Sequence, residues 1–502
     1  MRVRVGMARC APHYDGIAAP WSAGKNYPEV VRLLGEQEGR GPVNQVYAAV
    51  RDALHALGLD RERFGTSEWN PIGDLVAPDG RIVLKPNLIR HWNPADDGRG
   101  GTVDSVITHG AVIRAVADYA MIAVGREGSV AIAEAPQMDC DFDRIREIVG
   151  LDHIVAAYAE ALDRKLDVID LRRETVVFKD GVIENRRSLP GDPLGYRAVD
   201  LGDKSFFTGS GLDPNRFRGA DYDPGPTAEH HSGGRNAYLL SETVLSSDLV
   251  INLPKLKTHK KTGVTLALKN LVGINGDKNW LPHHSLGSVD EGGDEFPHNN
   301  FIDKLRSRAT EIARPFLAKG RGLKFFQAAR RVESATRGDQ FIRSGNWYGN
   351  RTTWRMCCDL NRCLYYSDRE GLHLDSAEPV RQVLTIIDGV LAGEGEGPLA
   401  PSNVPLGVVL AGTDPVAVDL AAVRLMGFDE NRLAKLRGPM EDKGPRITSV
   451  RSAEDVVVGE AGEGDLDITD RSLDELQADR CFEAHAGWVG HVERDQAGHR
   501  NS

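Results

Sequence analysis

Residues 249–270 read Leu-Val-Ile-Asn-Leu-Pro-Lys-Leu-Lys-Thr-His-Lys-Lys-Thr-Gly-Val-Thr-Leu-Ala-Leu-Lys-Asn, and the predicted fold is organised around this stretch. The apolar run at its start predicts a short buried strand. Pro254 has no N–H to donate to a neighbouring strand, so we expect the strand to end there and a basic loop to follow. Ligands of open α/β sheets bind beyond the carboxyl ends of the strands. The stretch therefore predicts an anion site.

The lysines after Pro254 are predicted to have different roles. Lys269 and Asn270 lie in the largely apolar segment 262–273, which favours burial. A buried lysine must be paired or have a lowered pKa, so we favour a functional role for Lys269. Lys260 and Lys261 are more simply interpreted as surface charges.

The order of predicted elements favours a mostly parallel, doubly wound sheet with helices on both faces. Strands are predicted at residues 3–7, 81–85, 129–134, 166–171, 383–388, 408–412 and 456–458. Helices are predicted at residues 43–58, 111–124, 143–162, 238–245 and 357–365. Asp180-Gly181 predicts the turn of a β-hairpin.

Polar side chains collect where the predicted strands end. Lys85 and Asn87 flank Pro86, and Thr108 is expected to cap a helix with His109 in its first turn, where the helix dipole favours a neutral imidazole. Residues 389–398 contain several glycines and Glu394, which predicts a loop able to approach a ligand closely. Asp414 is expected to cap the next helix, whose apolar sequence carries Asp419.

Four segments are predicted along the chain. Residues 1–300 form an N-terminal α/β part, 301–345 a basic helical insertion, 346–490 a C-terminal α/β part that completes the domain, and 491–502 a disordered tail. A solvated amphipathic insertion is the favoured interpretation of 301–343. The alternative is a docking face for an acidic partner, a polyanionic substrate or a membrane surface.

Composition excludes several classes of function. The chain has 502 residues and a formal net charge of -11, which disfavours specific or nonspecific nucleic-acid binding by its surface. No apolar stretch reaches the length of a membrane span, and no secretory signal is evident, so we expect a cytoplasmic protein. The six cysteines show no C-x-x-C pair, and those at 357, 358 and 363 are expected to be buried on a helix. The histidines match no tight metal motif, which leaves a metal or cofactor open.

The assembled motifs resemble the DUF362 family, a large group of mostly uncharacterised prokaryotic proteins. The residues that carry the resemblance are Lys85-Pro86-Asn87, Thr108-His109, Leu253 to His259, Thr265 to Gly273, Asp388-Gly389 with Glu394 to Pro398, and Asp414 to Asp419. The resemblance covers roughly residues 80–430 and implies a bacterial protein. Some relatives carry ferredoxin-type cysteine clusters or a twin-arginine signal. This chain has neither, so no iron–sulfur cluster is expected.

Two functions remain open from the sequence. The first is an enzyme acting on a small anionic substrate by acid/base or lysine-assisted chemistry. Its catalytic candidates are His259, Lys269, Glu394 and Asp419, and its substrate-binding candidates are Lys85, Asn87, His109, Lys255, Lys257 and Asn270. The second is a ligand- or metal-binding accessory protein for a maturation or biosynthetic pathway, with the basic insertion as its partner face.

Overall fold

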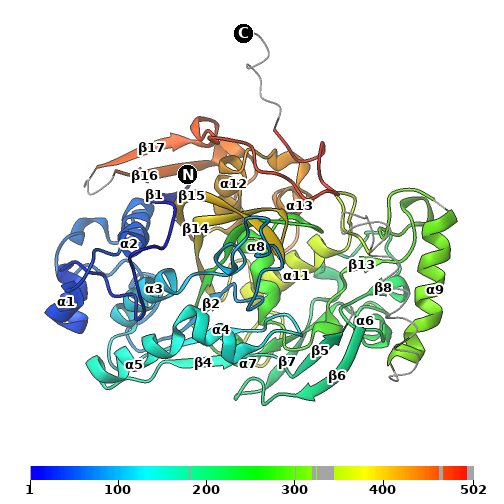
Figure 1. The fold of residues 1–502 in the computed structure, drawn as a ribbon, viewed down its shortest axis with the longest axis horizontal. Coiled ribbons are helices and arrows are strands. Elements are labelled where there is room, and N and C mark those ends of the chain that lie inside the picture. The colour runs from blue at the N-terminus through cyan, green and yellow to red at the C-terminus, as the bar shows by residue number, and fades with distance from the viewer. Residues whose placement is uncertain are drawn as a thin grey trace, which may run out of the picture.

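The computed structural model describes residues 2–179, 182–299, 301–318, 324, 344–462 and 467–494. Its central feature is an eleven-stranded mixed sheet (Figure 1). The main path of this sheet runs β17 (Ile468–Ser472), β16 (Val456–Ala461), β1 (Val3–Arg9), β15 (Ala400–Gly412), β14 (Gln382–Glu396), β10 (Leu249–Leu253), β2 (Arg81–Pro86), β3 (Ser129–Glu134) and β4 (Asp167–Asp170).

The strands from β14 to β4 are parallel to one another, and β16 is parallel to β1. Strand β15 runs antiparallel to both β1 and β14, and β17 runs antiparallel to β16. The predicted α/β class with a mainly parallel central sheet is therefore confirmed. The doubly wound arrangement and the helical insertion stay predictions.

Apolar side chains cover both faces of the sheet because successive residues of a strand point to opposite sides. Val83 and Val250 belong to one buried cluster, while Ile82, Leu249 and Ile251 belong to another. Helices α11 (Thr353–Tyr366) and α12 (Pro415–Leu425) pack in the first cluster, and α2 (Gln45–Leu57) and α3 (Gly110–Val124) in the second. The three cysteines of α11 are buried, as predicted.

Two predicted helices differ from the structure. The helix expected at 143–162 is divided into α4 (Phe142–Val149) and α5 (Leu151–Leu162) by Gly150, whose φ of 71° ends the first helix. The helix expected at 238–245 is strand β9 (Ala237–Ser241) followed by the single turn α7 (Glu242–Leu245). Strand β9 pairs with β7 (Tyr196–Asp200), so tertiary pairing overrides the helical pattern.

Two predicted loops are strands. Residues Lys255–His259 form β11, because Pro254 withholds only its own N–H and its carbonyl accepts a 2.9 Å hydrogen bond from Asp388 N. Strand β11 pairs with β14 and with the short β12 (Gly263–Val264). The glycines of 389–396 lie within β14, where neighbouring chain passes too closely for a side chain: a Cβ on Gly393 would meet Ser105 O at 2.8 Å.

The remaining described elements surround the sheet. They are α1 (Pro28–Leu34), the hairpin β5 (Glu174–Lys179) and β6 (Val182–Ser188), β8 (Phe217–Arg218), α6 (Gly225–His230), α8 (Leu266–Asn270), β13 (His284–Ser285), α9 (Phe301–Ala318) and α13 (Ala434–Glu441). The predicted hairpin is confirmed, although its turn at 180–181 lies outside the described residues.

Helix α9 covers the first part of the predicted insertion and stands at the edge of the molecule in Figure 1. The rest of 301–343, except residue 324, and the tail 495–502 lie outside the described residues. Residues 491–494 pack back on the chain, with Arg494 N donating to Gly427 O at 3.0 Å. No helix among the described residues is long and apolar enough to cross a membrane.

Candidate functional site

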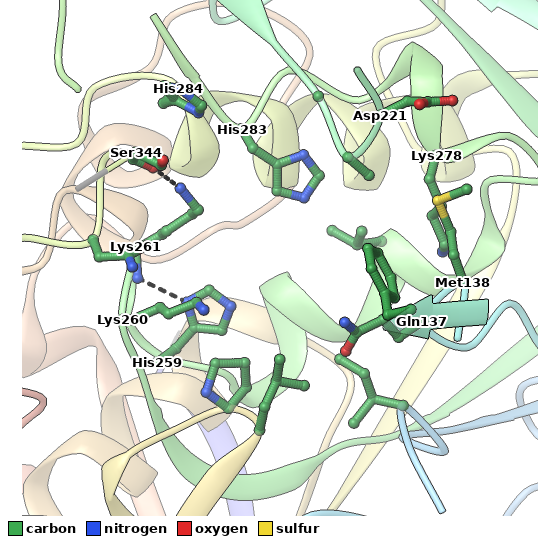
Figure 2. A pocket seen from close by; sticks show the side chains of 18 of the residues that line it. Gln137, Met138, Asp221, His259, Lys260, Lys261, Lys278, His283, His284 and Ser344 are labelled. Atoms are coloured by element: carbon green, nitrogen blue, oxygen red, sulfur yellow. Dashed lines mark hydrogen bonds between the residues drawn. The ribbon is translucent and has the colours of Figure 1, made fainter. Parts of the chain in front are cut away.

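A cavity of about 880 Å³ opens beyond the carboxyl ends of β2 and β3. Six of the ten predicted site residues line it: Lys85, Asn87, Lys257, His259, Lys269 and Asn270. Figure 2 shows His259 and Lys261 on one side of the space and Gln137, Met138 and Lys278 on the other, with the His283 ring directed between them.

The floor of the cavity is a fixed polar network. Lys85 Nζ lies 2.6 Å from Glu134 Oε2 and donates to Asn270 Oδ1 at 3.2 Å. Asn87 Nδ2 donates to the same Asn270 oxygen at 2.8 Å, which leaves the buried Asn87 Oδ1 without a partner among the described residues. Gly273 packs directly on the ion pair, where a Cβ would lie 1.8 Å from Glu134 Oε1. Only glycine permits this approach.

Lys269 is a buried lysine whose charge affects the ionisation of the groups around it. It is 8% exposed, and no described residue accepts a hydrogen bond from its ammonium group or forms an ion pair with it. Burial lowers its pKa, and its charge in turn lowers the pKa of the groups around it: Lys85, Lys257, His259, Lys261, Lys278 and His283. Adding protons to this cluster is unfavourable without a counter-charge.

The carboxylates that line the cavity have other partners. Glu134 binds Lys85, Asp221 binds Arg186, Asp303 faces Arg306 at 3.8 Å, Glu311 binds Arg314 at 2.6 Å, and Glu295 accepts from Ser307 at 2.8 Å. Lys257, Lys261, Lys269 and Lys278 consequently have no carboxylate within ion-pair distance among the described residues. The site holds excess positive charge on a protein whose formal net charge is -11.

Two lysines are held by backbone carbonyls alone. Lys278 Nζ donates to Ala135 O at 2.8 Å, and Lys261 Nζ donates to Ser344 O. Burial, together with neighbouring lysines, lowers the pKa of each to about 7. The prediction that Lys261 lies on the surface is wrong, because it is 9% exposed. Both lysines therefore change charge near neutral pH.

Two of the three histidines that line the cavity, His283 and His259, have their ring protons on different nitrogens. His283 Nδ1 lies 2.8 Å from Leu281 O, and a carbonyl only accepts, so Nδ1 carries the proton and Nε2 is left as an acceptor. His259 Nδ1 accepts from Lys261 N at 3.1 Å, which places its proton on Nε2. Burial lowers the pKa of His283 to about 3 and that of His259 well below its usual value, so both are neutral.

Helix α8 points Lys269 into the cavity through a strained turn. Leu266 has φ 53°, a left-handed conformation that is unfavourable for a branched side chain. Asp419 accepts from the backbone N of Ala267 at 2.6 Å and lies 3.4 Å from Lys435 Nζ. Lys435 also donates to Thr265 O at 2.7 Å. Asp419, a catalytic candidate from the sequence, holds α8 and does not line the cavity.

His109 and Lys255 lie in a separate buried cluster. Lys255 Nζ lies 3.0 Å from Asp388 Oδ2 and donates to Tyr14 Oη at 2.8 Å, and the Tyr14 ring stacks on His109 at 3.8 Å. The prediction that Thr108 caps α3 is wrong: His109 is the N-cap, with Nδ1 accepting from Ala111 N at 3.2 Å, and the Thr108 hydroxyl donates to Leu253 O. These two predicted binding residues are not brought to the cavity.

Glu394 also lies elsewhere. Its carboxylate binds Arg480 and accepts from Glu483 N at 2.8 Å, which joins β14 to the C-terminal segment. Asp414 caps α12 as predicted, by accepting from Val416 N and Ala417 N. Among the described residues, no group of three or more histidine, cysteine or acidic side chains is arranged to hold a metal ion.

Several lining residues were not among the predicted site residues. Lys278 begins a single turn of 3-10 helix and His283 lies in a loop, and only their proximity in sequence to Lys269 pointed to them. Glu134 follows a predicted strand in the same way as Lys85, and that shared position was the available signal. Side chains of α9 line the cavity because of tertiary packing, and the local sequence pattern of a helix does not predict its tertiary contacts.

The family model described as "Domain of unknown function (DUF362)" matches residues 196–424. This span contains β10, β11, α8 and β14, whereas Lys85 and Glu134 of the cavity precede it. No curated protein and no solved structure matches the chain. The resemblance to the DUF362 family is therefore confirmed over residues 196–424.

Proposed function

We propose that the protein binds a small organic anion in the cavity beyond β2 and β3 and transfers a proton on it. The observation that carries this proposal is Lys269, a buried ammonium group without a carboxylate partner that disfavours protonation of six neighbouring groups. A carboxylate or phosphate would offset this repulsion and accept hydrogen bonds from Lys269 and Lys261. Contacts to buried, fixed groups are stronger than the same contacts in bulk water.

The proton transfer uses His283 and His259, both of which are neutral. His283 Nε2 can take a proton from one atom of the bound molecule and return it to another, while His259 Nε2–H donates a hydrogen bond to the negative charge that develops in between. Their second ring nitrogens are fixed by backbone groups. Lys269 would stabilise negative charge that develops on the ligand. The proposal does not use Glu394 or Asp419, since their carboxylates are engaged elsewhere.

Isothermal titration with sulfate, pyrophosphate and citrate tests the binding step. We expect at least one of these anions to bind, and Lys269→Gln to weaken it about tenfold or more, corresponding to about 1.4 kcal/mol. Lys165→Gln is the matched control, because Lys165 is 82% exposed and pairs with Asp167. Absence of binding for all three anions, or equal affinities for the two variants, would contradict the proposal.

A further inference from the structure

The cavity has an apolar wall across the space from His259 and Lys261. Met138 and Ile183 belong to a small apolar cluster, and Tyr222 packs against it. Phe178 lies on the hairpin β5–β6, which also carries Ile183. All four residues line the cavity. Figure 2 shows Met138 across the space from His259 and Lys261.

Phe178 is the notable member of this wall. It keeps 37% of its surface exposed, whereas Met138 and Ile183 are 5% and 7% exposed. The hairpin is held against the loop that follows β8, because the backbone N of Ile183 donates to Tyr222 Oη at 2.9 Å. Covering an exposed aromatic ring with an apolar group of a ligand is favourable, because it removes apolar surface from water.

The volume of the cavity exceeds the needs of an inorganic anion. Pockets of about 300–1,000 Å³ enclose drug-sized organic ligands, and 880 Å³ lies in the upper part of that range. Lys269 and Lys261 lie outside the hairpin, so an anion bound to these two lysines leaves the space along the hairpin unfilled. The ligand that fits both walls has an anionic end and an apolar body.

We infer that the ligand is an amphiphilic anion whose charged group lies on Lys269, Lys261 and His259, and whose apolar body packs against Phe178, Met138 and Ile183. This inference rests on the proposed anion binding and adds the chemical class of the ligand. The hairpin β5–β6 thereby becomes the part of the molecule that selects the ligand, while the floor of the cavity supplies its charge recognition.

Titration with three probes separates the two contributions. Inorganic phosphate carries the charge alone, hexanol carries the apolar chain alone, and hexyl phosphate carries both. We expect hexyl phosphate to bind at least tenfold more tightly than phosphate and hexanol to bind more weakly than either. This gain corresponds to about 1.4 kcal/mol or more, which is well within the value of burying several methylene groups.

A variant and a matched control on strand β5 test where the apolar body of the ligand binds. Phe178→Ser should remove most of the preference for hexyl phosphate over phosphate. Val177→Ser is the matched control, because Val177 is the preceding residue of β5, is 55% exposed and does not line the cavity. Met138→Ser provides a second variant of the wall, and thermal denaturation confirms that each variant is folded.

The outcomes distinguish this inference from the proposed function. Equal affinities for phosphate and hexyl phosphate would overturn the amphiphile and leave the anion site standing. A preference for hexyl phosphate that survives both Phe178→Ser and Met138→Ser would overturn the assignment of this wall. Hexanol binding as tightly as hexyl phosphate, or no binding of any probe, would overturn the anion site and this inference with it.

Discussion

The carboxylate of Asp419 lies 2.6 Å from the backbone nitrogen of Ala267, immediately after the strained residue Leu266. The same carboxylate faces the fully buried side chain of Lys435 at 3.4 Å. Helix α8, and with it Lys269, is therefore held from behind by a buried ion pair. The groups that position the site are distinct from those that face the cavity.

Replacing Asp419 should destabilise the fold strongly. Asp419→Ala leaves Lys435 buried without its carboxylate, and breaking a buried pair in this way costs about 3–5 kcal/mol. Chemical denaturation measures this loss. Asp79→Ala, a change at an exposed carboxylate, should stay within about 0.5 kcal/mol of the original protein. A loss at Asp419 no larger than that of the control would show that the ion pair does not hold α8.

Removing the charge of Lys269 should have opposite effects on stability and binding. Lys269→Met eliminates a buried cation that repels its neighbours, so the free energy of unfolding should rise. One pKa unit of unfavourable interaction corresponds to about 1.4 kcal/mol, which sets the expected order of the gain. Anion affinity should fall in the same variant. Thermal denaturation with and without sulfate measures both effects, and a variant that loses stability while keeping its response to sulfate contradicts this account.

Anion binding should weaken as the pH rises through 7. The folded pKa values of Lys261 and Lys278 are about 7, so both are charged below that pH and neutral above it. Sulfate keeps its charge from pH 6 to 9, and its dissociation constant should increase at least tenfold over that interval. Isothermal titration at both pH values tests this expectation. An affinity independent of pH would mean that neither lysine contacts the anion.

The same lysines should make the ligand-free protein more stable in mild alkali. Their pKa values lie below the unfolded value of about 10.4, so between these limits the unfolded chain binds more protons than the folded one. Their contribution to the free energy of unfolding therefore rises with pH from about 7 to 10. Lys261→Gln and Lys278→Gln should each flatten this rise in denaturation curves. If the slope is unchanged in both variants, other groups control it.

The tautomers of the two histidines can be observed directly. Nitrogen NMR of histidine-labelled protein at pH 7 should show His283 with its proton on Nδ1 and His259 with its proton on Nε2. Assignment uses His283→Gln and His259→Gln, each of which removes one set of signals. Two imidazolium spectra, or the same tautomer at both positions, would remove the basis for the proposed proton transfer.

Much of the cavity could be predicted because its residues follow apolar strands. Lys85, Asn87 and Lys257 lie at or just beyond such runs, and the carboxyl ends of parallel strands meet at one edge of a sheet. Lys269 was recognised from the apolar character of its segment. The burial of Lys261 could not be predicted, because it depends on the carbonyl of Ser344, a residue far along the chain.

The sequence also placed four polar residues at the site that the fold uses elsewhere. A carboxylate in an apolar segment can bind a ligand or a backbone N–H, and Asp419 does the second. His109 and Lys255 follow the same strand-end rule as Lys85, yet they lie in the cluster around Asp388. Two lysines of the same strand, β11, thus serve different sites: Lys255 pairs with Asp388, while Lys257 lines the cavity.

The most direct measurement of the central claim is a crystal structure of the protein with tungstate, a tetrahedral anion located by its anomalous scattering. The account predicts an anomalous peak inside the cavity, within ion-pair distance of Nζ of Lys269, and no such peak in crystals of Lys269→Met. Peaks confined to the outer surface of the protein, or a peak in the cavity that remains in the Lys269→Met crystals, would contradict it.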